Sequence, residues 1–327
     1  MSFSFIGAGS PLVDYTVAVS DAFLQQYGCK CKGGTEHINA KERAGLFAAF
    51  NGKFLRTPGG AAANTVCALG RLGVKCSFFG KLGNDDDGNF FRDELIKSQV
   101  SADELIFVAG DTGCCISLVT PDAERTMRSD LGVSTMLDEH DFNRCDFGRY
   151  DWLLSEGYML QIPRFETIFS RARQAGCRIA LDVSSIEIAR NNHNKIIALL
   201  ASSVNLVFCN ELEAAALTGN NDPEYNVAYL SGICGMAVVK LGAAGSLVKA
   251  ENSGIYRIPA YNFGAAVDTT AAGDHYAAGF FYGLAMQKDL ETCGVYGSVL
   301  GSAAAAVHGS RITGELWTQV VNIINNQ

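Results

Sequence analysis

The sequence has no excess of basic charge, no internal repeat, no low-complexity tract and no proline-rich linker. Its 26 lysines and arginines stand against 34 aspartates and glutamates, and the resulting net charge of −8 argues against a nucleic-acid or anionic-membrane surface. Only 18% of the residues are charged and 48% are hydrophobic, so a sizeable core is expected and disorder is not. The 327 residues suit one large α/β domain, or a main domain with a smaller appendage.

None of the eleven cysteines forms the CxxC pair of a zinc site. Cys29 and Cys31 make a CxC, Cys114 and Cys115 are adjacent, and the others are isolated. We interpret them as reduced thiols that serve as small apolar side chains. The opening SFSFIGAGSPLVD indicates a first strand and has neither the basic region nor the cleavage site of a secretory signal. Together these features predict a cytoplasmic protein.

Residues 292–310 contain no Asp, Glu, Lys or Arg, a run that approaches the length needed to span a bilayer. However, Gly294, Gly297 and Gly301 recur in it at helical spacing and keep its hydrophobicity low. We therefore expect a close-packed helix inside a soluble domain, without a membrane contact.

Short apolar runs alternate with amphipathic stretches along most of the chain, which indicates parallel βαβ units. The expected strands are 3–8, 75–82, 152–156, 178–183, 206–210 and 236–240. The expected helices include 64–72, 162–175, 188–202 and 211–217. The predicted fold is α/β, a doubly wound and mainly parallel sheet with helices on both faces, in which ligands bind beyond the carboxyl ends of the strands.

Two segments, at about 14–56 and 112–128, break this alternation. The first contains the polar, glycine-bearing run GCKCKGGTEHINAKERAGLF, and the second has the alternation and turn of a β-hairpin from Cys114 onward. We expect both to form a small, discontinuous β-rich lid, inserted in two pieces into a single domain that spans 1–327.

The run AVDTTAAGDHYAAGFFYGLA, residues 266–285, joins the end of a strand-like segment to an amphipathic helix. Ala271, Ala272 and Gly273 form a turn of small residues, which lets the backbone and the free N–H groups of the first helical turn approach a ligand. Asp274 could accept a proton from an attacking hydroxyl there, while the amides stabilise charge on a transferring phosphoryl group. The alternative is that Asp274 is only a helix N-cap.

A second motif, TPGGAAANTVCALGRLG, covers residues 57–73. Gly59 and Gly60 open a helix that carries Asn64 on its first turn. Such a glycine pair lets a substrate lie against the backbone, and the amide side chain can both donate to and accept from sugar hydroxyls. The alternative is a tight turn and helix start followed by glycine C-caps.

A third motif, CNELEAAALTG, places Asn210, Glu211 and Glu213 where a strand passes into a helix. Oxygen ligands at such a point suit Mg²⁺, which binds few protein groups and keeps several waters. Two carboxylates in a first helical turn also complement the helix dipole, so the motif alone leaves both interpretations open.

A fourth motif, KLGAAGSL at residues 240–247, is the end of a strand followed by a glycine turn. Lys240, Gly242 and Gly245 could border a nucleotide phosphate. A simple hairpin turn would have the same sequence.

In this order and at these distances, the four segments resemble the ribokinase-like (pfkB) carbohydrate kinase family over essentially the full chain. DTTAAGD resembles the signature that ends in the family's catalytic aspartate, with alanine at position 271 where glycine is commoner. GGAAAN resembles the family's N-terminal sugar-kinase signature, and NELE resembles its NxxE magnesium motif. VDYTVAV, after the first strand, resembles the place where an aspartate binds substrate hydroxyls.

The resemblance implies an ATP- and Mg²⁺-dependent kinase for the hydroxymethyl group of a sugar or nucleoside. The implied catalytic residues are the general base Asp274 and the anion-hole turn of Ala271, Ala272 and Gly273. The implied substrate-binding residues are Asp14, Gly59, Gly60, Asn64 and Glu156. Those implied for ATP and its phosphates are Asn210, Lys240, Gly242, Gly245, Thr269 and Arg125. Glu213 and Asn210 would hold Mg²⁺ largely through water, and Asp268 with Thr270 would help to coordinate a monovalent cation such as K⁺.

A second interpretation stays open for three side chains. Glu156 equally suits a satisfied strand-end residue, and Arg125 suits a solvated hairpin surface. His275, the direct neighbour of Asp274, could tune the site but is expected on the helix surface.

The long segment KGGTEHINAKERAGLFAAF resembles the corresponding insert of adenosine kinases and their bacterial relatives. It favours the 5′-hydroxyl of a nucleoside, with adenosine first, and leaves a free sugar (ribose, fructose or a keto-deoxy sugar) as the alternative. The lid leaves a monomer or a homodimer open.

Two features of the sequence also suggest classes of protein other than a kinase. GAGSPLVD suggests a dinucleotide-binding oxidoreductase, but Leu12 stands where the third glycine of that fingerprint belongs. A non-catalytic sensor of a nucleotide or sugar is the other alternative, and the presence of Asp274 argues against it.

Overall fold

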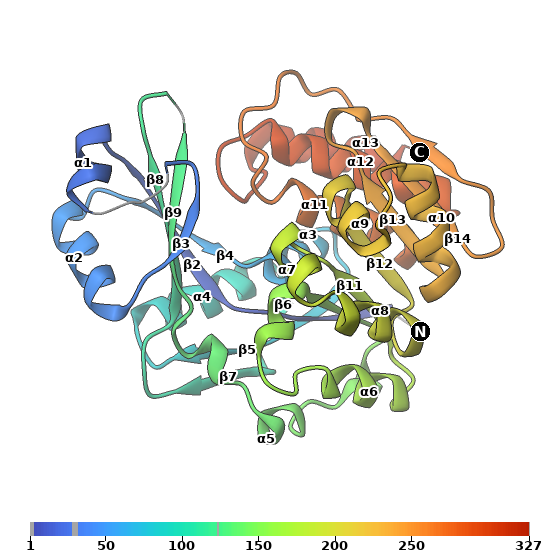
Figure 1. Ribbon diagram of the computed structural model, residues 1–327, viewed down its shortest axis with the longest axis horizontal. Helices are drawn as coiled ribbons and strands as arrows, with labels where there is room; N and C mark the ends of the chain where they lie inside the picture. Colours follow the sequence, from blue (N-terminus) through green and yellow to red (C-terminus); the bar gives the residue numbers. More distant parts are fainter. Residues whose placement is uncertain (1–2, 28–31, 123, 327) are drawn as a thin grey trace.

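The computed structural model describes residues 3–27, 32–122 and 124–326 of the chain. The CxC of Cys29 and Cys31, with the start of the glycine-bearing run, lies outside these residues. The described chain forms a large β-sheet flanked by helices and a smaller sheet beside it, seen on the left of Figure 1.

The large sheet is mainly parallel, as predicted. Its strands are β1 (Ser4–Ala8), β5 (Lys75–Gly83), β6 (Val100–Ser101), β7 (Leu105–Val108), β10 (Trp152–Glu156), β11 (Arg178–Asp182), β12 (Leu206–Asn210), β13 (Met236–Lys240), β14 (Ser246–Ala250) and β15 (Tyr256–Ile258). They follow the order β15-β14-β13-β12-β11-β10-β1-β5-β6, with β7 also paired to β5. Pairing is parallel from β13 through β6, whereas β14 and β15 are antiparallel.

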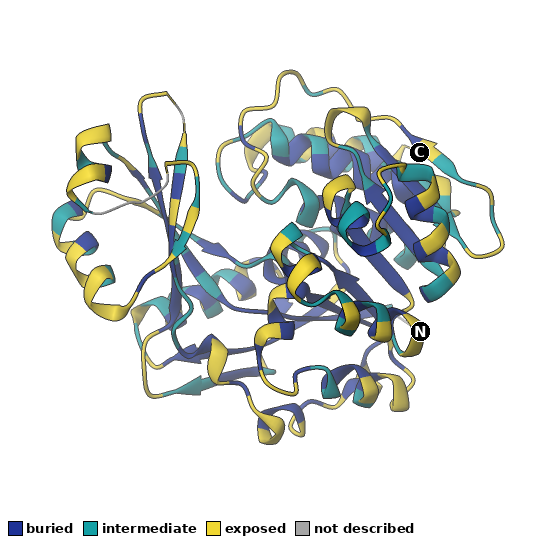
Figure 2. Ribbon diagram, in the orientation of Figure 1, coloured by how far each residue is buried: buried dark blue, intermediate teal, exposed yellow. Residues whose placement is uncertain are grey.

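Side chains alternate along each strand, so each strand contributes to a core on both faces of the sheet. In β1, Phe5 packs in one hydrophobic cluster and Ile6 in the other, and both are fully buried. Figure 2 shows the resulting layers, with buried strands in the middle and exposed residues on the outer sides of the helices. This arrangement confirms the predicted doubly wound fold.

The helices divide between the two faces. The Phe5 cluster is covered by α3 (Ala61–Arg71), α4 (Asp86–Lys97), α11 (Ala272–Ala285), α12 (Leu290–Ala305) and α13 (Gly314–Asn325). The Ile6 cluster is covered by α5 (Glu139–Phe142), α6 (Thr167–Gln174), α7 (Ile186–Asn191), α8 (His193–Ser202), α9 (Glu211–Thr218) and α10 (Pro223–Cys234). Short 3₁₀ turns are η1 (Gly132–Met136), η2 (Phe147–Arg149), η3 (Gly157–Gln161) and η4 (Gly242–Ala244).

The smaller sheet comes from the two segments that interrupt the βαβ pattern. Its strands are β2 (Leu12–Ala18), β3 (Thr35–His37), β4 (Leu55–Gly59), β8 (Gly113–Val119) and β9 (Arg125–Asp130), in the order β3-β9-β8-β2-β4. Two helices, α1 (Asp21–Gln26) and α2 (Ala40–Phe50), lie beside it (Figure 1). The expected hairpin is present, because β8 and β9 pair antiparallel. That this sheet acts as a lid stays a prediction.

Two predicted helices differ from the structure. The helix expected over 162–175 begins only at Thr167, because Pro163 holds Ile162 in an extended conformation and Arg164 has a positive φ of 61°. The helix expected over 188–202 is two helices, α7 and α8, which meet at Asn192.

The uncharged run near the C-terminus forms most of α12, which packs closely against α11. A Cβ added to Gly283 of α11 would lie 2.8 Å from the Cα of Cys293, so glycine is what allows this approach. No helix in the described part of the chain is both long enough and apolar enough to span a membrane.

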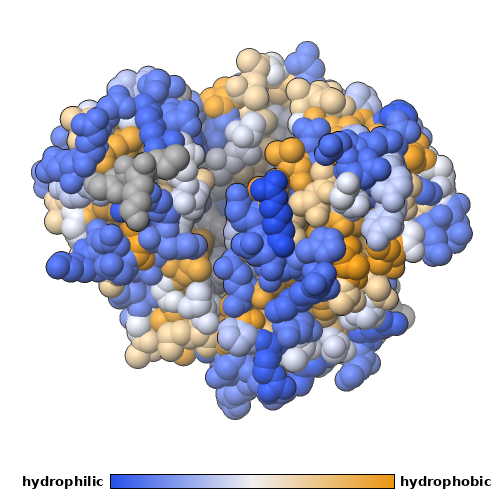
Figure 3. Space-filling view, in the orientation of Figure 1, coloured by the Kyte–Doolittle hydropathy of each residue, from blue (hydrophilic) through white to orange (hydrophobic). Residues whose placement is uncertain are grey.

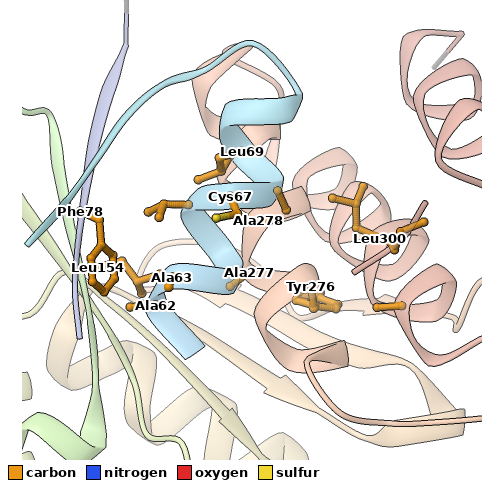
Figure 4. Packing of buried hydrophobic residues seen from close by; sticks show 14 of the residues in the cluster. Ala62, Ala63, Cys67, Leu69, Phe78, Leu154, Tyr276, Ala277, Ala278 and Leu300 are labelled. Atoms are coloured by element: carbon orange, nitrogen blue, oxygen red, sulfur yellow. The ribbon is translucent and has the colours of Figure 1, made fainter. Parts of the chain in front are cut away.

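Small side chains also bring α3 and α11 together. Figure 4 shows Ala62, Ala63 and Cys67 of α3 near Ala277 and Ala278 of α11. Because the two helices approach closely here, their N-terminal turns lie side by side, and these turns carry the residues that the sequence singles out.

Candidate active site

A cavity of about 770 Å³ lies beyond the carboxyl ends of β11, β12 and β13 and reaches the first turn of α11. It includes the predicted residues Asp274, Asn210, Glu213 and Lys240 in its lining. The space-filling view shows the surface hollowed between the smaller sheet and the helices of the large sheet (Figure 3). This is the position at which doubly wound folds bind ligands.

The first turn of α11 leaves its backbone amides without a cap. Ala271, the N-cap residue, has a left-handed φ of 60° and makes no side-chain cap hydrogen bond. The N–H of Ala272 donates to the carbonyl of Thr269 at 3.2 Å, which closes a tight turn. The next two amides, of Gly273 and Asp274, belong to the helical positions that have no intrahelical acceptor. They are suitably placed to bind an anion.

The Asp274 carboxylate lies between α11 and α3. Asn64 donates its side-chain N–H to Asp274 Oδ2 at 2.9 Å, and Thr65 Oγ1 donates to the Asp274 backbone carbonyl at 3.0 Å. Burial raises the pKa of Asp274 to about 7, with a further contribution from the negative charge of Asp182 and opposition from Asn64 and Lys240. A carboxyl group with such a pKa can exchange a proton near neutral pH. Asp274 is the third residue of α11 and Ala271 is the N-cap, so the alternative that Asp274 is only a helix N-cap is wrong.

Asp14 and the glycine pair form a second part of the site. A Cβ on Gly59 would collide with the Asp14 carboxylate, so that glycine leaves room for the carboxylate. Gly60, at φ 96°, takes a conformation that residues with a side chain rarely adopt, and its turn starts α3. Burial and the charge of Asp274 raise the pKa of Asp14 to about 7, against the lowering effect of Arg125. The charge of Asp274 thus makes it harder to ionise Asp14.

Glu156 is buried at the end of β10. Its two carboxylate oxygens accept hydrogen bonds from the backbone N–H groups of Ser10 and Ala62, each at 2.9 Å. Burial nevertheless raises its pKa to about 7. The carboxylate thus ties the loop after β1 to the first turn of α3, as expected of a satisfied strand-end residue.

Lys240 brings positive charge to the anion-binding turn. Its Nζ lies 3.0 Å from Asp182 Oδ2, and a Cβ added to Gly273 would lie only 2.9 Å from the same Nζ. Although burial disfavours its charge, Asp182 and Glu213 outweigh that effect and raise the pKa of Lys240. Lys240 therefore remains a cation directly beside the amides of α11.

Asn210 and Glu213 form a closed capping box at the start of α9. The Asn210 backbone N–H and side-chain N–H donate to the two oxygens of Glu213 at 2.9 and 2.8 Å, and Asn210 Oδ1 accepts from the Glu213 N–H at 2.9 Å. Burial and the charge of Asp182 raise the pKa of Glu213 to about 7. Within the described residues, no three His, Cys, Asp or Glu side chains are close enough to hold a metal directly. The pair therefore fits a magnesium ion contacted through water, since each carboxylate oxygen keeps a second lone pair.

Arg125 of β9 reaches from the smaller sheet to the loop before α11. It donates to Asp268 Oδ2 at 2.6 Å and to Thr270 Oγ1 at 3.0 Å. The backbone N–H groups of Gly309 and Thr270 also donate to Asp268, at 2.7 and 3.0 Å. The arginine is thus in an ion pair and not on a freely solvated surface. In this structure the Asp268 carboxylate, which was predicted to help bind a monovalent cation, is paired with the guanidinium of Arg125.

The remaining nucleotide-site residues border the cavity. Gly242 and Gly245, both with positive φ, form the turn between the antiparallel strands β13 and β14, and Thr269 also lines the cavity. The two interpretations of the KLGAAGSL motif are therefore compatible, because its hairpin turn also lines the cavity.

Sequence reasoning did not single out Asp182 and Tyr158, which both line the cavity, and it misplaced His275, which lies outside the cavity lining. Asp182 could have been noticed as a carboxylate at the end of a predicted parallel strand. Tyr158 has no such signal, since only the folded chain brings its ring, 45% exposed, to the cavity. His275 was expected on the helix surface and is only 3% exposed, because α11 is covered on several sides by other elements.

Comparisons with known proteins identify the family of the chain. The pfkB family carbohydrate kinase profile matches residues 49–317. The aminoimidazole riboside kinase of Salmonella typhimurium is 31% identical over 71% of this chain and 75% of its own. The ATP-dependent ribose-1-phosphate kinase of Halopiger xanaduensis is 29% identical over 77% of this chain and 82% of its own.

Among solved structures, the adenosine kinase of Sinorhizobium meliloti matches with a TM-score of 0.86 and 28% identity, over 99% of this chain and 100% of its own. Fold and sequence together define a phosphotransferase of the sugar and nucleoside kinase class. The chain belongs to the pfkB family of carbohydrate kinases.

Proposed function

We propose that the protein transfers the γ-phosphoryl group of ATP to the 5′-hydroxyl of a nucleoside, with adenosine as the favoured acceptor. The observation that carries the proposal is the position of Asp274, which shares the start of α11 with uncapped amides and meets Asn64 of α3. The oxygen of the acceptor hydroxyl forms a bond to the γ-phosphorus while the bond between that phosphorus and the β–γ bridging oxygen breaks. The proton of the acceptor hydroxyl passes to Asp274, and ADP leaves.

The amides of Gly273 and Asp274 stabilise the negative charge on the transferring group, and Lys240 adds a fixed cation beside them. Asn210, Gly242, Gly245 and Thr269 border the phosphates of ATP. Glu213 and Asn210 would hold Mg²⁺ through water, and this ion would neutralise phosphate charge when bound. On the acceptor side, Asp14 and Asn64 hydrogen-bond the sugar hydroxyls, and Gly59 and Gly60 let the ring lie against the backbone.

Three observations favour a nucleoside as the acceptor. The Sinorhizobium meliloti adenosine kinase matches the whole chain, including the smaller sheet, and the Salmonella relative acts on a riboside. Tyr158 presents an accessible aromatic ring to the cavity that contains Asp274, and a nucleobase could stack on it. A free sugar has no aromatic group to fill that contact.

The smaller sheet acts as the lid in this proposal. Arg125 joins it to Asp268 across the entrance, and on closure the guanidinium could move to the phosphates. If Asp268 and Thr270 bind K⁺, Arg125 must first leave the carboxylate. Closure would exclude water, which limits hydrolysis of ATP when no acceptor is bound.

The test is ADP release from Mg-ATP with adenosine, other nucleosides, ribose, fructose and keto-deoxygluconate, using wild type, Tyr158→Phe and Tyr158→Ala. We expect saturable turnover with adenosine, and the Tyr158→Phe variant should retain it. The KM for adenosine should rise in the Tyr158→Ala variant. Turnover with a free sugar alone would discard the nucleoside assignment and keep the mechanism. Nucleotide binding without any turnover would favour the non-catalytic sensor.

The proposal also predicts an acid limb in the pH profile. The pKa of Asp274 is raised to about 7, chiefly by burial, and only the carboxylate can accept the proton. Asp14 titrates in the same range. We expect kcat/KM to level off above about pH 8 and to fall as the pH drops below 7, with a slope that reaches about tenfold per pH unit or more below about pH 6. A profile that stays level from pH 8 to pH 5.5 would contradict Asp274 as the base.

A further inference from the structure

His275 is a buried polar side chain directly beside the anion-binding turn. Its imidazole is 3% exposed, and Nδ1 lies 3.0 Å from the backbone carbonyl oxygen of Ala271. The same carbonyl accepts the His275 backbone N–H, also at 3.0 Å. The carbonyl of the N-cap residue of α11 thus receives two hydrogen bonds from a single residue.

Ala271 is the strained position of this turn. It has φ 60° and ψ 4°, a left-handed conformation that glycine adopts freely and an alanine side chain disfavours. The uncapped amides of Gly273 and Asp274 follow directly, so their direction depends on Ala271 keeping this conformation. Because α11 has no side-chain N-cap, the contacts that remain to hold this turn include the Ala272 to Thr269 backbone hydrogen bond and the imidazole at the Ala271 carbonyl.

We propose that His275 is a positioning residue that locks the left-handed conformation of Ala271 and thereby aims the anion-binding amides of α11. The inference rests on the proposed function for its catalytic consequence. The lock itself is a property of the ligand-free protein. A glycine at position 271 would adopt the left-handed conformation without strain. With alanine there, the hydrogen bond from the imidazole stabilises that conformation instead.

The chemistry of the contact defines the state of the ring. A carbonyl oxygen is only an acceptor, so Nδ1 must carry the proton. Burial lowers the pKa of His275 to about 4, and the nearby charges of Arg71 and Arg311 act in the same direction. The ring is therefore neutral near pH 7 and has a single N–H, which points at Ala271.

Two substitutions separate the hydrogen bond from the volume of the ring. His275→Asn keeps a donor at nearly the position of Nδ1, whereas His275→Leu keeps comparable bulk without a donor. We expect the Leu variant to lower kcat roughly ten- to a hundredfold through misplaced amides, with a smaller change in KM for the acceptor, and the Asn variant to retain most of the activity.

Ala271→Gly provides the decisive background, because glycine needs no lock. In that background His275→Leu should change kcat by less than about threefold relative to Ala271→Gly alone. An equal loss of kcat in both backgrounds would overturn the proposal, since the histidine would then act independently of the turn. Equal kcat losses for the Asn and Leu variants would overturn it as well.

Measurements without substrate separate this inference from the proposed function. The imidazole ¹⁵N spectrum at neutral pH should show a protonated Nδ1 and an unprotonated Nε2 for His275. Ala271→Gly should raise Tm more in the Leu variant than in the wild type. The opposite tautomer, or equal shifts of Tm, would refute the lock even in an active kinase. An inactive wild type with both signatures would refute the proposed function alone.

Discussion

Asp274→Asn is expected to lower kcat by several orders of magnitude, about 10²–10⁴-fold from loss of the base alone, and to leave Mg-ATP binding nearly intact. The amide can still accept the hydrogen bond from Asn64, so the start of α11 should keep its geometry. It cannot accept the proton of the acceptor hydroxyl. Single-turnover kinetics and calorimetric titration with a non-hydrolysable ATP analogue measure the two effects separately.

The stability of this variant distinguishes lost chemistry from lost folding. The folded-state pKa of Asp274 is raised from 3.8 to about 7, so the stability that its protonated form contributes is lost as the pH rises through about 7. Above that pH the neutral asparagine avoids a buried charge, and Tm should equal or exceed that of the wild type. A lower Tm together with lower kcat would point to damage to the fold.

Asp289→Asn is the matched control for this substitution. Asp289 is exposed and caps α12 by accepting a hydrogen bond from the backbone N–H of Thr292 at 2.8 Å. Its substitution makes the same chemical change at the start of the neighbouring helix. We expect its kcat to stay at the wild-type value. Turnover by Asp274→Asn at the wild-type rate would remove Asp274 from the mechanism.

Gly279→Ala is expected to destabilise the protein by about 2 kcal/mol or more, because it overpacks the contact between α11 and α12. The added Cβ would collide with the backbone carbonyl of Tyr296 and stand 2.8 Å from the Gly297 nitrogen. Backbone atoms of a buried helix cannot move aside as a flexible side chain can. Urea denaturation measures the change in the free energy of unfolding, and kcat should fall too, since α11 carries Asp274.

Gly232→Ala makes the same substitution in a helix where space is available. Gly232 lies in α10 with nothing within 4 Å of the added Cβ, so the gain in helix propensity should stabilise the protein by about 0.5–1 kcal/mol. Equal effects for Gly279→Ala and Gly232→Ala would show that the close approach of α11 to α12 contributes little to stability.

Much of the fold follows from short stretches of sequence. The alternation of apolar runs with amphipathic stretches predicts β1, β10, β12 and β13 to within one residue, because burial on both faces of a parallel sheet marks each strand locally. Proline limits this approach, as the late start of α6 after Pro163 shows. Asp274, Asn210 and Lys240 each stand next to a strand end or a helix start, so local sequence marks them as candidates, and all three line the cavity. Their roles stay predictions.

Local sequence is enough to predict a doubly wound α/β chain with small-residue turns at its strand ends, because both signals lie within a few consecutive residues. Which side chains meet follows from the folded chain alone. Asp182 pairs with Lys240 across 58 positions, and Arg125 pairs with Asp268 across 143. It also buried His275, which the sequence places on a helix surface. Such contacts depend on how closely the helices pack and on which groups lose water, and the local periodicity of the sequence predicts neither.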